Sequence, residues 1–342
     1  MSETHLKGLD ALRAICASFL VLGHTAQTDF ATWNVFPLPI PECCAYVFFV
    51  ISGFLAGYKI ESISSASSYF KKKAQRLLPP YFLYIALTIV VYLCLGRRAE
   101  VVNPNLWYYV FLIPEIPFCL YNGILPLVHL WFIGSLVLFH IVFYAFSQFR
   151  GNRITGATII IVLWFSLKLL LRCLLGNNSL FYHFVGVTCF DVLFLGVLGG
   201  IAFHKEQKRF SELLLPRTAL VVNIASWLLF LSSGLYGRFI PAPLRPEFIS
   251  VLVLITVITQ QVLKPSILLE NRLLNWLSSI SYEMYVFHIL LIILLSIGYS
   301  NYWERPLPGI IIYLLCFSTT ILFAWGFKKG IASFVQPARL ES

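Results

Sequence analysis

Three ionisable residues lie in the first apolar segment of the chain, residues 8–27, namely Asp10, Arg13 and His24. An α-helix turns by about 100° per residue, so these three residues fall on one stripe, with His24 about 16 Å beyond Arg13 along the axis. An ionisable group in a membrane-spanning helix costs about 3 kcal/mol and usually faces a bundle interior or an aqueous cavity. The spacing therefore predicts a polar stripe along an otherwise apolar helix.

Histidine is the residue of this stripe that can carry a proton in a reaction, because its ordinary pKa of about 6.5 leaves a neutral imidazole at pH 7. His24 is therefore expected to act as a general base or as a transient acyl acceptor, and the sequence does not separate the two. Arg13 stays charged and suits either a phosphate group or an ion pair with Asp10. Asp10 either joins the catalytic group or only neutralises Arg13 three residues away.

The composition shows which elements must position these residues. Of the 342 residues, 59% are hydrophobic and 12% are charged, whereas a soluble domain has about 25% charged residues. This predicts a single all-α domain over residues 1–342, a polytopic membrane helix bundle. Apolar runs of about 20 residues predict ten transmembrane helices, at 8–27, 41–59, 77–96, 127–147, 155–175, 183–203, 215–235, 247–264, 276–298 and 308–328.

The loop charges predict the orientation. A cytoplasmic N-terminus places most loop lysines and arginines on the inner side, and an even number of helices then makes both termini cytoplasmic. The net charge of +10 is explained by this topology, so no nucleic-acid partner is expected. Within residues 97–126, the stretch 106–120 is apolar and aromatic, but Pro104, Pro114, Glu115 and Pro117 predict an extracytoplasmic or interfacial loop instead of a span.

A basic stretch precedes the predicted third helix. Lys71, Lys72, Lys73 and Arg76 are able to bind a polyanion through charge-assisted hydrogen bonds, but they equally suit a topology anchor or anionic lipids. Pro79 and Pro80 are expected in the first turn of that helix, which would place Arg76 at an anion-binding helix N-terminus. Ser52, before Gly53 in the preceding span, suits ligand binding or simple close packing of helices.

Further polar residues are candidates for binding an acceptor, each with an ordinary structural explanation beside it. Lys168 and Asp191 fall at matching depths in neighbouring spans and are expected to pair, either as a tie between helices or as part of a binding cavity. His129 and Trp131 suit a sugar contact or an interfacial anchor. Tyr285 and His288 suit a tunnel lining or ordinary aromatic packing. The eight scattered cysteines show no metal-binding spacing, and no metal site is expected.

Five motifs in the same order resemble the membrane-bound acyltransferase-3 family of bacterial envelope O-acyltransferases. They are Asp10 and Arg13 followed by His24, FFVISGF at 48–54, the basic stretch ending at Pro79, HLWFIGSL at 129–136 and SYEMYVFHILLI at 281–292. Two positions depart from the common pattern: Lys73 stands where many members have arginine, and Leu136 where many have glutamate. The resemblance is to the membrane domain alone, without the SGNH esterase-like domain fused to some members.

The resemblance implies transfer of an acetyl group from cytoplasmic acetyl-CoA to a hydroxyl of a cell-envelope or lipid-linked glycan, such as a polysaccharide or lipopolysaccharide, in the bacterial inner membrane. It implies a catalytic role for Arg13 and His24, and donor binding by Lys73 and Arg76, with Lys72 and Ser52 beside them. The alternative is a transporter or flippase for a lipid-linked glycan or polysaccharide. No repeat of the first two motifs occurs in the second half of the chain, which favours the enzyme.

Overall fold

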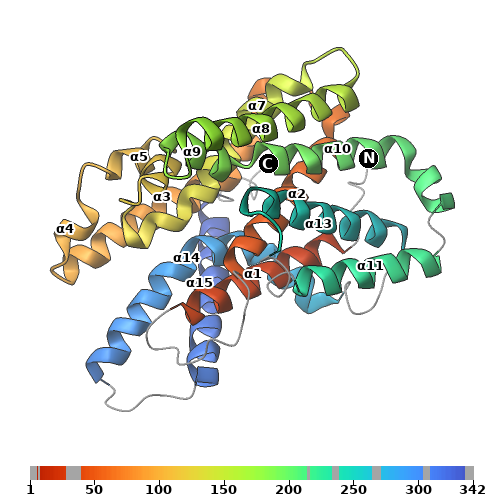
Figure 1. The fold of residues 1–342 in the computed structure, drawn as a ribbon. Helices are drawn as coiled ribbons and strands as arrows, with labels where there is room; N and C mark the ends of the chain where they lie inside the picture. Colours follow the sequence, from red (N-terminus) through yellow and green to blue (C-terminus); the bar gives the residue numbers. More distant parts are fainter. Residues whose placement is uncertain are drawn as a thin grey trace, which may run out of the picture. The chain divides into compact units, whose positions relative to one another are not determined.

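The computed structural model describes residues 6, 8–27, 40–213, 216–232, 239–263, 271–302 and 309–335, and within them every regular element is a helix (Figure 1). In these described ranges, eight helical segments are long and apolar enough to cross a membrane, and two shorter apolar helices coincide with the second and seventh predicted spans. The prediction of a polytopic all-α membrane protein is therefore confirmed, and ten apolar helices lie where ten were expected.

The longer helices are α1 (Leu9–Ala26), α2 (Ile40–Tyr58), α3 (Ala66–Cys94), α7 (Trp131–Ser147), α8 (Arg153–Leu175), α10 (Phe190–Leu213), α11 (Pro216–Leu231), α13 (Arg245–Val262), α14 (Arg272–Tyr302) and α15 (Gly309–Val335). The shorter ones are η1 (Ile60–Ser62), α4 (Arg98–Val101), α5 (Leu106–Val110), α6 (Glu115–Cys119), η2 (Leu125–Leu130), α9 (Leu180–Thr188) and η3 (Ala242–Leu244). Their contacts group the chain into two compact units: Met1–Leu9 with Ala45–Ser266, and Asp10–Cys44 with Ile267–Ser342.

In the first unit, α10 packs beside α8 and α13, and α13 packs beside α11. Glycines let α2 and α10 approach closely. A Cβ atom added at Gly53 would lie 2.0 Å from the carbonyl oxygen of Leu193, and one added at Gly200 would lie 2.1 Å from that of Phe54. These are contacts with backbone atoms, so only residues without a side chain fit there. Part of the FFVISGF motif is thus explained by helix packing.

Residues 97–126 contain only short helices, and the next candidate span begins at Leu125. The extracytoplasmic or interfacial location of this segment stays a prediction. Tyrosines of α3 hold this segment in place: the Tyr81 hydroxyl donates to the carbonyl of Tyr109 at 2.7 Å, and the Tyr84 hydroxyl donates to the carbonyl of Pro126. The Tyr109 hydroxyl in turn accepts from the backbone N–H of Ile124 at 3.1 Å. The segment is therefore fixed to the helix bundle by buried hydrogen bonds.

The start of α3 differs from the prediction. The helix begins at Ala66, where Ser65 caps it by accepting from the N–H of Ser68 at 3.3 Å, so Pro79 and Pro80 lie inside a 29-residue helix. The expected helix N-terminus beside Arg76 was wrong. The polar first turns are solvated on one side, which an apolar-run search does not detect. The two prolines leave carbonyls without a helical N–H partner in the turn that contains Arg76.

In the second unit, α14 and α15 lie side by side (Figure 1). Ile292 of α14 packs against Ile312 and Cys316 of α15, all three buried. Phe287 adds ring contacts with Phe323 at 5.0 Å and with Phe327 at 4.7 Å. This apolar packing fixes the rotation of α14 about its axis, and so the direction of the face that carries Tyr285 and His288.

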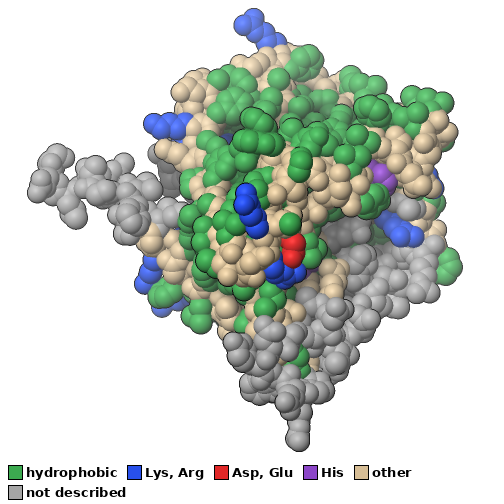
Figure 2. Space-filling model, turned by 90° about the vertical axis from the view of Figure 1, so that its left-hand side faces the viewer, with side chains coloured by type: hydrophobic (Ala, Val, Ile, Leu, Met, Phe, Trp, Pro, Cys, Tyr) green, Lys and Arg blue, Asp and Glu red, His purple; other side chains and the backbone are tan. Residues whose placement is uncertain are grey.

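Hydrophobic side chains cover much of the described surface shown in Figure 2, and charged ones are scattered among them. On α8, for example, the side chains of Leu163 and Leu174 are 64% and 70% exposed, while Lys168 on the same helix is 4% exposed. This distribution, with apolar side chains facing outward and a cation facing inward, is the reverse of that in a soluble protein. It fits a helix in contact with lipid.

Candidate functional site

His24 of α1 and His288 of α14 lie against one another in the second unit, with ring centroids 5.1 Å apart and an angle of 36° between the rings. The two residues are separated by 264 positions in the sequence (288 minus 24). The His288 side chain is fully buried, and the His24 side chain is partly buried. The structure therefore brings the predicted base into contact with a residue that was expected to line a tunnel or bind the acceptor, or else to take part in ordinary aromatic packing.

Hydrogen bonds define which nitrogen of each ring carries the proton. Nδ1 of His288 lies 2.6 Å from the carbonyl oxygen of Tyr285, and a carbonyl can only accept, so Nδ1 is the donor. Nδ1 of His24 lies 3.0 Å from Oε1 of Gln27 and donates to it in the same way. When neutral, both rings then carry their basic lone pair on Nε2, which is the tautomer a general base needs.

Asp10 joins α1 to α14 near the other end of the stripe. Its Oδ1 lies 3.3 Å from Nη1 of Arg13 and accepts from the hydroxyl of Ser278 at 3.1 Å. The side chains of Arg13 and Asp10 are 19% and 21% exposed, so the pair is partly buried and still reached by solvent. The Asp10–Arg13 ion pair left open by the sequence therefore forms, and Asp10 also binds α14.

The basic residues of α3 divide by their burial. Lys72 and Arg76 are exposed, and Lys73 is partly buried, with its ammonium 5.6 Å from the centre of the Tyr69 ring. The Tyr69 hydroxyl bonds Nδ1 of His140 on α7 at 2.9 Å, and the charges of Lys73 and Arg76 act on that histidine. Lys73 and Arg76 therefore share a face of α3 toward α7, while Lys72 remains in water.

The second and fourth motifs meet at the start of α7. Trp131 stacks on Phe118 of α6 at 5.3 Å and meets the edge of Phe49 of α2 at 6.1 Å. Ser52 lies one helical turn after Phe49, on the same side of α2. His129 is buried, with its ring edge-on to Tyr84 at 5.2 Å. An aromatic cluster therefore surrounds the predicted sugar-binding residues, and their role in acceptor binding stays a prediction.

The predicted pair of Lys168 and Asp191 forms, with Nζ 2.8 Å from Oδ2 and both side chains buried. The structure adds Glu247 of α13, whose Oε1 also bonds Nζ of Lys168. The cluster joins α8, α10 and α13 through one cation and two carboxylates. Removing one partner of such a cluster strongly destabilises the fold, because it leaves a buried charge without compensation. The cluster is a tie between three helices, and any contact with an acceptor stays a prediction.

Glu115 of α6 is a buried acid that the sequence did not single out as a site. Its side chain is fully buried, and neither carboxylate oxygen makes a hydrogen bond of good geometry within the described residues. It fits because residue 134 is glycine: a Cβ there would lie 2.5 Å from Oε2. Burial raises the pKa of Glu115 to about 8, opposed in part by its own N–H and the nearby Ser135 hydroxyl. The carboxyl is therefore mainly neutral at pH 7.

The raised pKa of Glu115 predicts a pH-dependent stability. In the unfolded chain the carboxyl ionises near pH 4.5, but in the folded chain near pH 8, so wild-type stability should fall across that range by up to about 5 kcal/mol. Glu115→Gln should remove this slope. The thermal unfolding midpoint in detergent, measured at pH 5.5 and pH 8, should drop more in the wild type than in the variant. An equal drop would refute the assignment.

The structure describes no group of three or more histidine, cysteine, aspartate or glutamate side chains able to hold a metal ion in its described residues. The eight cysteines all lie in the described part of the chain, and none of them forms a disulfide bond.

Comparison with known proteins identifies the chain. The model of the acyltransferase domain of the acyltransferase-3 family matches residues 6–329. Nodulation protein 10 of Rhizobium leguminosarum bv. viciae is 25% identical over 338 aligned residues, which cover 88% of this chain and 87% of that protein. No solved structure matches. The chain therefore belongs to the acyltransferase-3 family and is a multi-pass membrane acyltransferase.

Proposed function

We propose that the protein transfers an acetyl group from cytoplasmic acetyl-CoA to a hydroxyl of a cell-envelope or lipid-linked glycan in the bacterial inner membrane. The observation that carries the proposal is the contact of His24 with His288, because both rings have Nδ1 engaged in a hydrogen bond and so present Nε2 as the basic atom. Acyl transfer from a thioester to an alcohol needs such a base.

The proposed reaction begins with the hydroxyl proton of the acceptor moving to Nε2 of His24. The hydroxyl oxygen then forms a bond to the thioester carbon, the carbon–sulfur bond breaks, and the imidazolium returns its proton to the thiolate of CoA. In the alternative, Nε2 of His24 first takes the acetyl group and then passes it to the acceptor. The hydrogen bond from Nδ1 to Gln27 stabilises the positively charged ring in both routes.

For the donor, Lys73 and Arg76 are proposed to bind phosphate groups of CoA, with Lys72 and Ser52 contributing nearby. Arg13 is held by Asp10 at 3.3 Å and is partly exposed, and its planar guanidinium suits a phosphate group of the donor. For the acceptor, His288 and Tyr285 are proposed to line the position of the reacting hydroxyl, and Trp131 with His129 to bind a sugar ring. Lys168 and Asp191 contribute to the acceptor site only through the helices that they join.

The role of His288 is tested by replacing its ring. His288→Phe keeps an aromatic ring against His24 but removes both nitrogens. We expect kcat to fall at least tenfold and the pH profile of kcat to shift, because the basic neighbour of His24 is lost. If only packing mattered, the phenylalanine variant would keep the wild-type kcat and pH profile. Rapid quenching without acceptor, followed by mass spectrometry, separates an acetylated His24 from direct transfer.

The donor site is tested on α3. Lys73→Gln combined with Arg76→Gln should raise KM for acetyl-CoA at least tenfold and lower kcat much less, because charge-assisted bonds to phosphate act on binding. The matched control is Lys208→Gln with Arg209→Gln, which removes the same two charges from exposed residues of α10 outside the proposed site. An equal rise in KM for the control would show that surface charge alone attracts the donor.

A further inference from the structure

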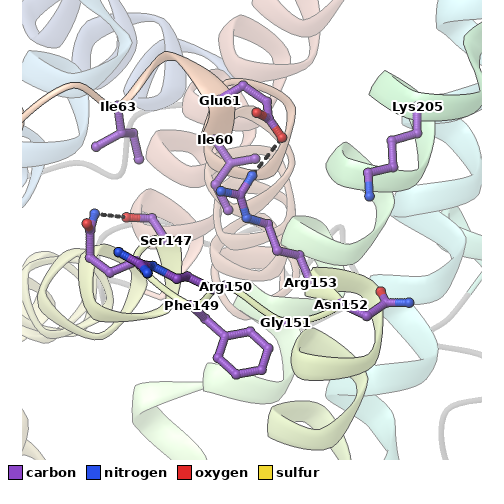
Figure 3. A pocket seen from close by; sticks show the side chains of 11 residues that line it. Ile60, Glu61, Ile63, Ser147, Phe149, Arg150, Gly151, Asn152, Arg153 and Lys205 are labelled. Atoms are coloured by element: carbon purple, nitrogen blue, oxygen red, sulfur yellow. Dashed lines mark hydrogen bonds and ion pairs between the residues drawn. The ribbon is translucent and has the colours of Figure 1, made fainter.

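A polar cavity of about 660 Å³ lies in the first unit, apart from the residues discussed above (Figure 3). It is bounded by η1, by the loop between α7 and α8, and by α10. The lining residues are Ile60, Glu61, Ile63, Ser147, Gln148, Phe149, Arg150, Gly151, Asn152, Arg153 and Lys205. The proposed acyl transfer uses none of them.

Three cations and one carboxylate line this cavity. Nη1 of Arg153 lies 2.7 Å from Oε1 of Glu61, and Figure 3 shows this ion pair joining α8 to η1. In the part of the chain that the structure describes, Arg150 and Lys205 form no ion pair with an acidic side chain, and both are exposed. The cavity therefore carries a surplus of two positive charges.

These cations come from different segments and line one cavity, which distinguishes them from basic residues that only set the membrane topology. A topology anchor needs only positive charge near the membrane surface, in any direction. Here Arg150 comes from the loop between α7 and α8, Arg153 is the first residue of α8, and Lys205 lies on α10 about fifty residues later, yet all three line one concavity. The straight part of α10 ends at Glu206, whose backbone is not helical. Lys205, just before this break, lines the cavity, whereas Lys208 beyond the break does not.

The cavity is also of the right size and chemistry for a ligand. Binding sites for small molecules have volumes of about 300–1,000 Å³, and this one lies within that range. Phe149, which also lines the cavity, is 50% exposed. Guanidinium and ammonium groups bind phosphate oxygens through short, charge-assisted hydrogen bonds. An acyl chain or another neutral apolar group would leave these cations unpaired.

We propose that this cavity binds a phosphate-bearing ligand through Arg150, Arg153 and Lys205. Two sources share this chemistry: a nucleotide with more than one phosphate, or the headgroup of an anionic phospholipid. The inference goes beyond the acyl transfer proposed above and does not depend on it, since binding is measured without turnover. Loss of transfer in His24→Ala would leave this site unaffected.

The experiment places a reporter at the cavity. Cys94 and Cys173 are the exposed native cysteines, so both are replaced by serine, and Gln148→Cys is introduced. The rate of maleimide modification at position 148 is then measured in lipid nanodiscs. Adenosine 3′,5′-bisphosphate is added to discs of phosphatidylcholine alone, and discs containing phosphatidylglycerol are compared without it. We expect at least a fivefold slower reaction with one of these probes.

The outcomes distinguish the two sources and test the cations. Protection by the bisphosphate in neutral discs supports a nucleotide, and protection only by phosphatidylglycerol supports a lipid headgroup. Arg150→Gln with Lys205→Gln should abolish the protection. Lys208→Gln with Arg209→Gln removes the same charge from exposed residues of α10 outside the cavity and should preserve it. No protection by either probe, or equal effects of the two double variants, would overturn the proposal.

Discussion

His24→Ala should lower kcat for acetyl transfer by at least about 10³-fold while changing the affinity for acetyl-CoA by less than threefold. Removing a general base usually costs between about 10² and 10⁴ in rate, and the loss is greater if His24 also carries the acetyl group. The donor-binding cations are other residues, so binding and chemistry should separate. The measurements are single-turnover transfer of labelled acetyl groups and equilibrium binding of acetyl-CoA in detergent.

His183→Ala is the matched control for this prediction. His183 lies on α9, with its Nε2 at 3.3 Å from the Tyr121 hydroxyl, and belongs to no part of the proposed site. This variant should transfer acetyl groups at the wild-type rate. If His24→Ala lost acetyl-CoA binding as completely as transfer, the division between a catalytic imidazole and donor-binding cations would be wrong.

Gly53→Ala should unfold or prevent assembly of the first unit. The added Cβ would lie 2.0 Å from the carbonyl oxygen of Leu193 and 3.1 Å from the N–H nitrogen of Val197. Both are backbone atoms of α10, so neither can rotate away, and α2 and α10 must separate. We expect a loss of more than about 3 kcal/mol, seen as a lower yield of folded protein and a lower thermal midpoint in detergent.

Gly186→Ala provides the comparison, because a Cβ at this helical position meets nothing within 4 Å. Alanine in a helix interior is more favourable than glycine by about 0.5–1 kcal/mol, so this variant should be as stable as the wild type or slightly more so. Equal thermal midpoints for the two alanine variants would mean that α2 and α10 do not pack as closely as the structure shows.

The positions of the apolar helices could be predicted from the sequence, but the residue at which α3 begins could not. Long apolar runs locate spans directly, but α3 begins eleven residues before its predicted start (77 minus 66). The polar turns from Ala66 onward have no apolar run to reveal them, and the pair of prolines suggested a helix start. The capping serine at position 65 was the available signal, because serine is among the preferred residues at that position.

The features of the site that could not be predicted are contacts between segments that are distant in the sequence. The stripe on α1 follows from helix geometry, but nothing in the sequence pairs His24 with His288 rather than with another histidine. Glu247 escaped notice because an acid in the first turn of a helix is already explained by the helix dipole. Glu115 escaped notice because its burial depends on the glycine at position 134, which is distant in sequence.

The central claim is tested most directly by following the acetyl group itself. Inverted inner-membrane vesicles containing the wild type or His24→Ala are incubated with acetyl-CoA labelled in the acetyl group, and label is measured in the extracted glycan fraction. The account predicts label in the glycan with the wild type and none above background with the variant. Unlabelled glycan that still crosses the membrane in a protein-dependent way, or equal labelling by the two proteins, would contradict it.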